Sequence, residues 1–116
     1  MIKLSIDQLA AILLSTLLMS TGQFLWKIGL ASESINLKLV TNVKIWLGGG
    51  AYIAATLIWF WLLKQLPLSL LYPFTAVSFV FGYLFSYFAL KEPIQAKEII
   101  GLLFIGIGLF LIAKQS

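Results

Sequence analysis

The sequence predicts an all-α, polytopic membrane protein with four transmembrane helices, and three observations favour this fold class. The 116-residue chain is 61% apolar and only 10% charged, which lies far outside the proportions of a soluble domain. Its apolar residues form four runs, each near the roughly 20 residues that a helix needs to cross the hydrocarbon of a bilayer. Because the backbone finds no water there, such runs are expected to be helical, and the short alternating strands of a membrane barrel are missing.

The first predicted helix covers about residues 5–30 and begins with a capping box. Ser5 and Gln8 have the spacing at which each side chain bonds the backbone N–H of the other. A cleaved signal peptide is the alternative interpretation of residues 9–18, but no small-residue cleavage site follows them closely. The polar segment of residues 31–42 is then the first loop, and its apolar members allow part of it to lie on the membrane surface.

Three further helices are predicted after this loop. The second covers about residues 43–63, with tryptophans towards its ends, where indole rings favour the membrane interface. The third covers about residues 69–90 and is rich in aromatic side chains. Residues 91–93 are expected to break it, because proline lacks an amide donor and constrains the residue before it. The fourth covers about residues 95–113, and the short joints make neighbouring helices antiparallel.

The composition also excludes several classes of function. The chain contains neither cysteine nor histidine, so no metal site and no cofactor is expected. It therefore also lacks a thiol nucleophile and the commonest general base of enzymes. The net charge of +4 comes from scattered lysines and not from a basic patch, which argues against nucleic acid as a partner. The lysines at the ends of the helices divide almost evenly between the two sides, leaning towards loops one and three in the cytoplasm and permitting insertion in both orientations. One side has Lys3, Lys64 and Lys114, and the other has Lys38, Lys44, Lys91 and Lys97.

Polar residues recur along one face of the first helix. Thr16, Ser20, Gln23 and Lys27 follow one another at spacings of four, three and four. An ammonium inside the bilayer costs about 2.5 to 3.5 kcal/mol, so Lys27 must either extend to the interface or bind something anionic. In the second interpretation Lys27, with Gln23 and Trp26 beside it, meets a phosphate or carboxylate at the mouth of a cavity.

Two more residues are candidate substrate contacts. Tyr72 offers a hydroxyl next to Pro73 near the start of the third helix, although tyrosines also favour the membrane interface without any ligand. Glu92 is either a further substrate contact or a loop carboxylate that pairs with Lys91 or caps the fourth helix.

Glycines predict where helices approach one another closely. Gly101 and Gly108 lie on one face of the fourth helix, two turns apart, and small residues allow membrane helices to associate. We expect this face to form a dimer interface, because four helices enclose little volume, with packing inside one chain as the alternative. Residues 48–51 provide another smooth face, on the second helix, which we assign to packing.

In this pattern the chain resembles the small four-helix members of the drug/metabolite transporter superfamily. The resemblance extends over most of the chain, and its motifs are weak singly but fairly specific together. They are Gly22-Gln23 with Lys27, Leu66-Pro67 leading to Tyr72-Pro73, Lys91-Glu92-Pro93, and Ile99-Ile100-Gly101 followed by Gly108.

Two branches of that superfamily compete. The small multidrug resistance branch uses a buried glutamate about two turns before the position of Lys27, where this chain has Met19, and it has an aromatic residue where this chain has Thr75. The subunits of the aminoarabinose-phosphoundecaprenol flippase look closer, because they share the Gly-Gln-x-x-x-Lys, Tyr-Pro and Glu-Pro patterns. This resemblance implies movement of a polyprenyl-phosphate-linked sugar, or a related anionic lipid, across the bacterial plasma (inner) membrane.

The leading hypothesis is therefore a transporter subunit, not an enzyme, that acts as a homodimer or as a heterodimer with a related subunit. The first three helices would form the cavity and the fourth the dimer interface. The lipid tail needs only apolar surface, whereas the phosphate and sugar need a polar track such as the stripe on the first helix together with Tyr72. The alternatives are a small multidrug-type exporter and a non-transporting membrane partner of a glycosyltransferase complex.

Overall fold

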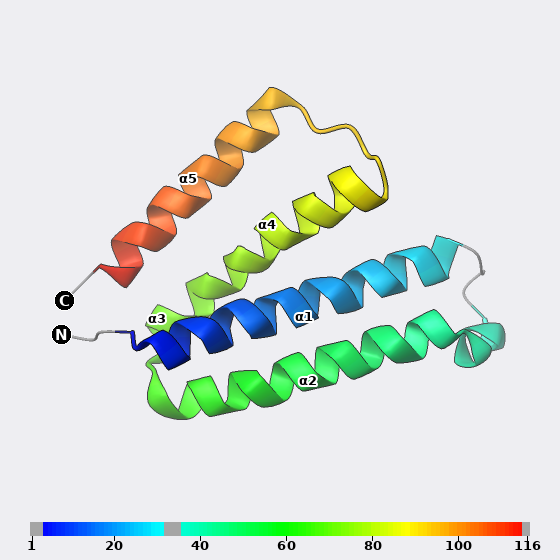
Figure 1. Ribbon diagram of the computed structural model, residues 1–116, viewed down its shortest axis with the longest axis horizontal. Helices are drawn as coiled ribbons and strands as arrows, with labels where there is room; N and C mark the ends of the chain where they lie inside the picture. The colour runs from blue at the N-terminus through cyan, green and yellow to red at the C-terminus, as the bar shows by residue number, and fades with distance from the viewer. Residues whose placement is uncertain (1–3, 32–35, 115–116) are drawn as a thin grey trace.

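The computed structural model describes residues 4–31 and 36–114, and the predicted all-helical fold class is confirmed (Figure 1). Within these residues, four helical spans are long and apolar enough to cross a membrane: Ile6–Ala31, Val43–Gln65, Leu68–Ala89 and Ala96–Ala113. The chain is thus a multi-pass membrane protein. Lys3 and residues 32–35 of the predicted first loop lie outside the described residues.

Three of the four spans are single helices, and one is composite. The single helices are α1 (Ile6–Ala31), α2 (Val43–Gln65) and α5 (Ala96–Ala113). A short 3-10 helix, η1 (Leu37–Thr41), precedes α2. The composite span consists of α3 (Leu68–Leu71), the 3-10 helix η2 (Tyr72–Ala76), α4 (Val77–Leu84) and the π-helical turn η3 (Phe85–Ala89).

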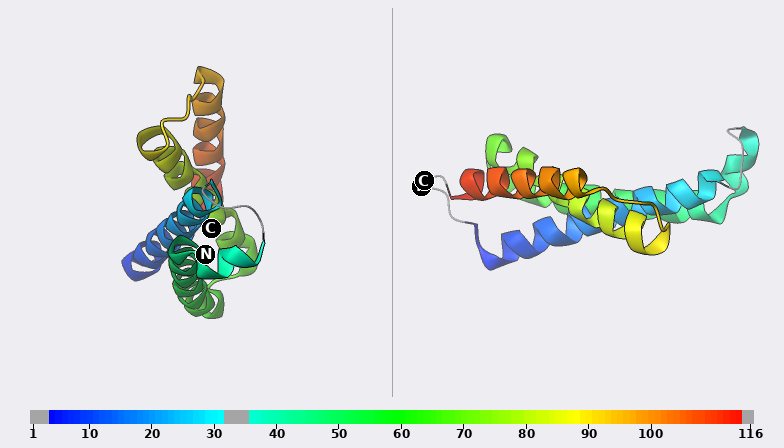
Figure 2. Two further views of the ribbon diagram at one scale, coloured as in Figure 1. Left: turned by 90° about the vertical axis from the view of Figure 1, so that its right-hand side faces the viewer. Right: turned by 90° about the horizontal axis from the view of Figure 1, so that it is seen from above.

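The spans run alternately up and down, so that α1 begins and α5 ends at the same end of the molecule (Figures 1 and 2). Helices α1 and α2 lie side by side along their whole length, and α4 packs on the other side of α1. The joint from α1 to α2 and the joint from η3 to α5 lie at the opposite end of the molecule. We call this second end the joint end.

Glycines bring α1 and α2 into backbone contact. A Cβ atom on Gly22 would lie 2.7 Å from the carbonyl oxygen of Gly48, and a Cβ on Gly48 would lie 2.6 Å from Cδ1 of Trp26. The Trp26 indole donates a hydrogen bond of 3.1 Å to the Ile45 carbonyl and stacks on the ring of Tyr52. The smooth face predicted on the second helix therefore serves packing at Gly48.

A small apolar core closes the end of the molecule where α1 begins, away from the joint end. The core joins α1, the end of α2 and the beginning of the composite span, and the last residues of α5 pack against its edge. Its buried members are Ile12, Leu62, Leu66, Leu70, Leu71 and Phe74.

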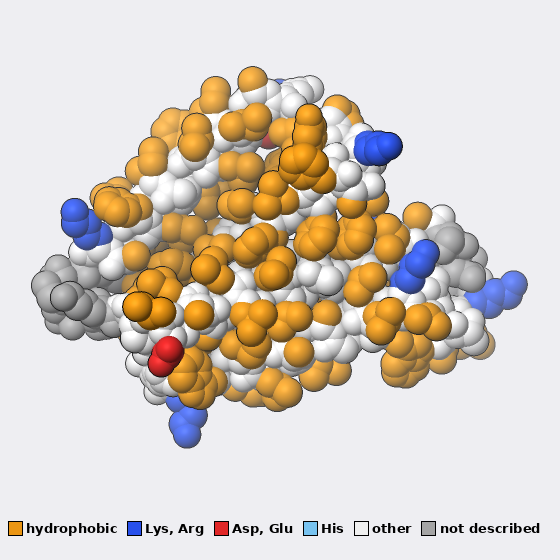
Figure 3. All heavy atoms as spheres, in the orientation of Figure 1, with side chains coloured by type: hydrophobic (Ala, Val, Ile, Leu, Met, Phe, Trp, Pro, Cys, Tyr) orange, Lys and Arg blue, Asp and Glu red, His pale blue; other side chains and the backbone are white. Residues whose placement is uncertain are grey.

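Helix α5 stands apart from the other spans, and none of its residues is buried. It meets the core through Ile112 and Ala113, while its other end diverges from α4 (Figure 1). Apolar side chains cover much of the surface in view, as expected for a surface that faces lipid (Figure 3). A Cβ on Gly101 or Gly108 would meet no atom within 4 Å, so neither glycine packs against another helix of the chain. The dimer interface there stays a prediction.

Both long helices at the chain's ends begin with side chains that cap their first turn. The predicted capping box of α1 is confirmed, because the Ser5 N–H donates to Gln8 Oε1 at 3.0 Å and the Gln8 N–H to Ser5 Oγ at 3.1 Å. At α5 the Gln95 N–H donates to Glu98 Oε2 at 2.8 Å. The suggestion that Glu92 caps this helix is therefore wrong, and Glu98 has that role.

The composite span ends at Ala89, so the break expected at residues 91–93 lies where it was predicted, but the residue that turns the chain is Lys91 and not Pro93. The N–H of Leu90 donates to the Phe85 carbonyl at 3.1 Å, and the N–H of Glu92 reaches back to the Ser86 carbonyl at 3.0 Å. Between them Lys91 has a φ of 57°, which is in the left-handed region that favours glycine. The chain leaves the helix at Lys91 because this conformation redirects it.

The contact between α1 and α2 predicts the effect of adding one methyl group. In Gly48→Ala the new Cβ must displace the Gly22 backbone or the Trp26 ring, and such overpacking costs about 1 to 3 kcal/mol. The midpoint of thermal unfolding in detergent, followed by helical circular dichroism, should fall by several degrees. Gly49→Ala is the matched control, because its Cβ meets nothing within 4 Å and its midpoint should hold or rise. Equal behaviour of the two variants would contradict close packing at Gly48.

The left-handed residue at the end of the composite span predicts a stabilising substitution. Lys91→Gly relieves a conformation that costs an L-residue on the order of 1 kcal/mol, whereas Lys91→Ala removes the same charge and keeps the strain. The glycine variant should therefore unfold at a higher temperature than the alanine variant in the same detergent. A lower midpoint for glycine would show that Lys91 does not adopt this conformation.

Candidate functional site

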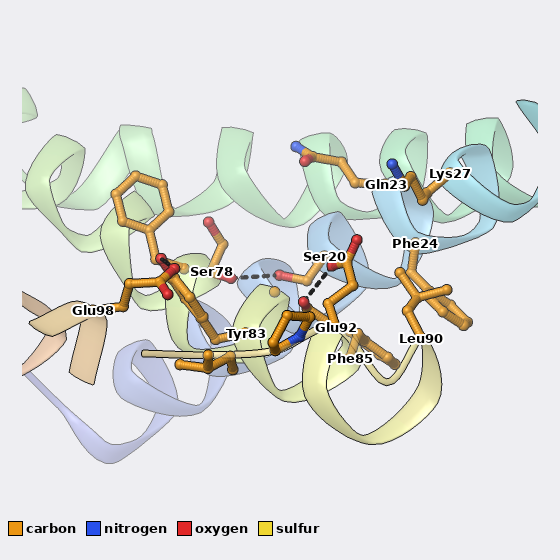
Figure 4. Close-up of a pocket in the computed structure, with 15 residues that line it drawn as sticks. Ser20, Gln23, Phe24, Lys27, Ser78, Tyr83, Phe85, Leu90, Glu92 and Glu98 are labelled. Atoms are coloured by element: carbon orange, nitrogen blue, oxygen red, sulfur yellow. Dashed lines mark hydrogen bonds between the residues drawn. The ribbon is translucent and has the colours of Figure 1, made fainter. Parts of the chain in front are cut away.

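A cavity of about 700 Å³ lies between α1, the second half of the composite span and the joint to α5 (Figure 4). It lies towards the joint end, and Glu98 is the residue of α5 that lines it. Volumes of this size suit ligands the size of a drug or a small sugar. Its lining combines aromatic rings with an unusual number of polar groups for a membrane interior. The polar lining residues are Ser20, Gln23, Lys27, Ser78, Tyr83, Ser86, Glu92 and Glu98.

One wall of the cavity is the polar stripe of α1. Ser20 is 6% exposed, and its hydroxyl lies 2.8 Å from the Thr16 carbonyl oxygen and 3.0 Å from the Ser78 carbonyl oxygen, so one proton is shared between α1 and α4. Gln23 and Lys27 follow on the next two turns, and both side chains are exposed at the edge of the cavity (Figure 4). This wall therefore presents an amide and an ammonium to whatever enters.

The opposite wall carries two carboxylates that come from different elements. Glu92, in the joint, accepts a hydrogen bond from the Ser86 hydroxyl and points towards the wall formed by α1 (Figure 4). Glu98, in the first turn of α5, accepts a hydrogen bond of 3.2 Å from the Tyr83 hydroxyl through Oε1, while Oε2 caps its own helix. Among the residues that the structure describes, neither carboxylate forms an ion pair.

Aromatic rings and the π-helical turn shape the cavity near Lys27. Phe24 of α1 stacks on Phe85 with the ring centroids 4.8 Å apart, which joins α1 to the end of the composite span. Turn η3 begins at Phe85 and includes Ser86, so two lining residues come from its wider helical turn. Such π turns occur often at functional sites, where they alter the direction of side chains.

The structure brings four of the seven candidate contact residues together in this cavity: Ser20, Gln23, Lys27 and Glu92. Thr16 is fully buried, and its hydroxyl donates to the Ile12 carbonyl at 2.8 Å in its own helix. Trp26 faces α2, as described above. Tyr72 is 63% exposed and lines a separate, shallow hollow near the start of the composite span, at the other end of the molecule.

Glu98 and Tyr83 line the cavity but were not among the residues chosen from the sequence. The spacing of Gln95 and Glu98 could have indicated a capping box, which would have fixed the carboxylate at the start of the fourth helix. The contact between Tyr83 and Glu98 depends on the angle between α5 and the composite span, and helical periodicity gives no information on that angle.

Four apolar spans, with a cavity of charged walls between α1, the composite span and the start of α5, define a small multi-pass membrane protein with a candidate binding site among its helices. The comparison with curated proteins gives the family. A protein of Photorhabdus laumondii, named as a probable 4-amino-4-deoxy-L-arabinose-phosphoundecaprenol flippase subunit ArnF, is 31% identical over 119 aligned residues, which cover 90% of this chain and 94% of the relative. The chain belongs to this family of flippase subunits, as its motifs predicted.

Two further relatives carry the corresponding ArnE name and match over shorter segments. The protein of Pseudomonas fluorescens is 33% identical over 72 residues, or 62% of this chain and 63% of the relative. The protein of Proteus mirabilis is 37% identical over 60 residues, or 52% of this chain and 53% of the relative. The match thus spans less than two thirds of the length of these two relatives. No family model and no solved structure matches the chain.

Proposed function

We propose that the chain is a transporter subunit that carries a polyprenyl-phosphate-linked sugar, or a related anionic lipid, across the bacterial plasma membrane without a chemical step. The observation that carries the proposal is the ammonium of Lys27, which lies at the cavity edge beside Gln23 and has no ion pair within the described residues. The names of the ArnE and ArnF relatives, which specify a phosphoundecaprenol lipid, support the same substrate class.

The cavity and the outer surface suit the two parts of such a lipid. A phosphate is matched by the Lys27 ammonium as a point charge and by the Gln23 amide as a further donor. The remaining volume accepts a sugar, whose hydroxyls find partners in Ser78 and Ser86. The polyprenyl tail needs only apolar surface, which the exposed faces of α4 and α5 provide in quantity.

The subunit is proposed to act with a second copy or a related chain. The relatives are named as subunits, and α5 offers a face with open space at Gly101 and Gly108. Small residues on an otherwise bulky helix let a partner backbone approach closely. We place the contact between subunits on this face of α5.

A small multidrug-type exporter is the second candidate. The two carboxylates of the cavity favour it, because cationic drugs need anionic partners. It lacks, however, the buried glutamate of that branch on α1, where Met19 stands. The third candidate, a non-transporting partner of a glycosyltransferase, predicts co-purification with that enzyme and no lipid movement by the purified chain in liposomes.

Lys27 provides the test of lipid recognition. In Lys27→Met, binding of an aminoarabinose-linked undecaprenyl phosphate to the full chain in nanodiscs should weaken by at least about tenfold, because one charge-assisted bond to the phosphate is lost. Membrane levels should not change. The matched control is Lys44→Met, which removes one positive charge from the same end of the molecule but outside the cavity. Any effect of the lost charge on the orientation of the chain in the membrane should therefore be the same in both variants.

The outcome decides between the two interpretations of Lys27. If Lys27→Met binds the lipid as the unaltered chain does, the ammonium only extends to the membrane interface and the proposal fails. Uptake of tetraphenylphosphonium by liposomes that contain the chain, with no movement of the lipid between leaflets, would instead support the multidrug-type exporter.

A further inference from the structure

Large apolar side chains are exposed at the joint end, where the chain enters α2. Leu37 and Val40 of η1 are 88% and 60% exposed, and Trp46, in the first turn of α2, is 66% exposed. Helix η1 lies beside the start of α2 at this end (Figure 1). We call these three residues the η1 platform. Apolar surface of this size is unfavourable in water, so another medium or molecule must cover the platform.

The geometry of η1 separates its apolar side chains from its charge. In a 3-10 helix, side chains three residues apart lie one above the other, so Leu37 and Val40 share a face. By the same rule Lys38 and Thr41 share the next face, and both are exposed. Leu39, on the third face, is partly buried. Helix η1 is therefore a short amphipathic element whose apolar face is open and has an ammonium beside it.

Hydrogen bonds join the η1 platform to the membrane-spanning helices. The Trp46 indole N–H donates to the Val40 carbonyl, which connects the start of α2 with η1. The exposed part of the indole is therefore apolar, because its N–H is used within the chain. The Asn42 amide donates to the Gly29 carbonyl at 3.1 Å and connects the same segment with the end of α1. The platform is thus held at a fixed height relative to α1 and α2.

Two opposite requirements determine the depth of the platform in a bilayer. A helix of five residues leaves most of its backbone N–H and C=O groups without partners inside the helix, and such backbone is not tolerated against hydrocarbon. The exposed side chains of Leu37, Val40 and Trp46, in contrast, are unfavourable in water. The headgroup region satisfies both requirements, because amphipathic segments there insert their apolar face about 5 to 10 Å into the boundary with the acyl chains.

We infer that the η1 platform inserts into the membrane interface and that Lys38 beside it pairs with the phosphates of anionic phospholipids such as phosphatidylglycerol. Residues 36–47 contain two lysines, Lys38 and Lys44, both exposed, and no acidic residue. Their charge complements an anionic lipid surface. Glu33, the nearest acidic residue in the sequence, lies outside the described residues. Lysine and apolar side chains lie next to each other at this end of the molecule (right side of Figure 3).

The inference does not depend on the proposed function, because it concerns the lipids around the chain and not a lipid that enters the cavity. It does have a consequence for the cavity. Lys27 precedes Gly29 by two residues, or about 3 Å along the helix, and the Asn42 amide binds the Gly29 carbonyl. A platform at the level of the headgroups therefore holds the Lys27 edge of the cavity close to the same level.

The depth of the platform is the first test. The chain contains no cysteine, so one spin label can be attached to Val40→Cys in the full chain in nanodiscs. The label should collide more often with oxygen, which concentrates in the bilayer, than with a water-soluble nickel chelate. Thr41→Cys, on the next face, is the matched control and should show the reverse order.

Two results of this measurement would overturn the inference. If the label at residue 40 meets the nickel chelate as readily as the label at residue 41, the platform faces water. If the label at residue 40 is shielded from both reagents, a second copy or another protein covers the platform instead of lipid.

The choice of lipid tests the role of Lys38. In phosphatidylcholine bilayers at low salt, the unaltered chain should prefer spin-labelled phosphatidylglycerol over spin-labelled phosphatidylcholine by at least about fivefold, the contribution of one lysine near an anionic surface. In Lys38→Gln this preference should fall by about threefold or more. Lys64→Gln is the matched control, because it removes an exposed ammonium at the other end of α2, and it should keep the preference.

The remaining outcomes count against the anionic lipid. If the unaltered chain shows no preference, or if Lys38→Gln and Lys64→Gln lower it equally, Lys38 is no special contact and the inference fails. Neither result affects the proposed function, which is tested separately by the binding of the polyprenyl lipid to Lys27→Met.

Discussion

The backbone contact between Gly22 and Gly48 determines how α1 is turned, and the cavity depends on that rotation. Successive residues of a helix are separated by about 100°, so a helix that directs Gly22 and Trp26 at α2 must direct Gln23 and Lys27 to a different side. That side faces the composite span. A larger residue at either glycine would push α1 away from α2, and the amide and ammonium would lose their position opposite the carboxylates.

The sequence was sufficient to predict the four spans but not which neighbouring helix each side chain meets. Apolar runs of about 20 residues have no alternative to helices in a bilayer, so the four spans could be predicted with their approximate bounds. The polar stripe of α1 was also predictable as a shared face, because helical periodicity determines it. Periodicity does not say which neighbour a face meets, and Trp26 therefore turned out to contact α2 although it lies beside Gln23 in the chain.

The position of Tyr72 could have been deduced from connectivity alone. The first and third spans run in the same direction, so the end of one lies level with the end of the other. Lys27 is near the end of its span and Tyr72 near the start of its own, which places them at opposite ends of the molecule. By the same reasoning, Glu92 and Glu98, at the end of the third span and the start of the fourth, belong to the level of Lys27. Their side-chain directions, however, depend on the left-handed turn at Lys91 and on the angle of α5.

The polar wall of α1 is short compared with a bilayer. From Ser20 to Lys27 a helix rises about 10 Å, whereas the hydrocarbon is roughly 30 Å thick. Beyond Ser20, the Thr16 hydroxyl bonds the backbone of its own helix, and a second hollow with polar side chains lies at Tyr72, at the far end of the molecule. On the proposed function, a charged headgroup would find polar groups near each face of the bilayer and an apolar interval between them. Its passage would require that interval to be shortened, by local thinning of the bilayer or by polar groups from a neighbouring subunit.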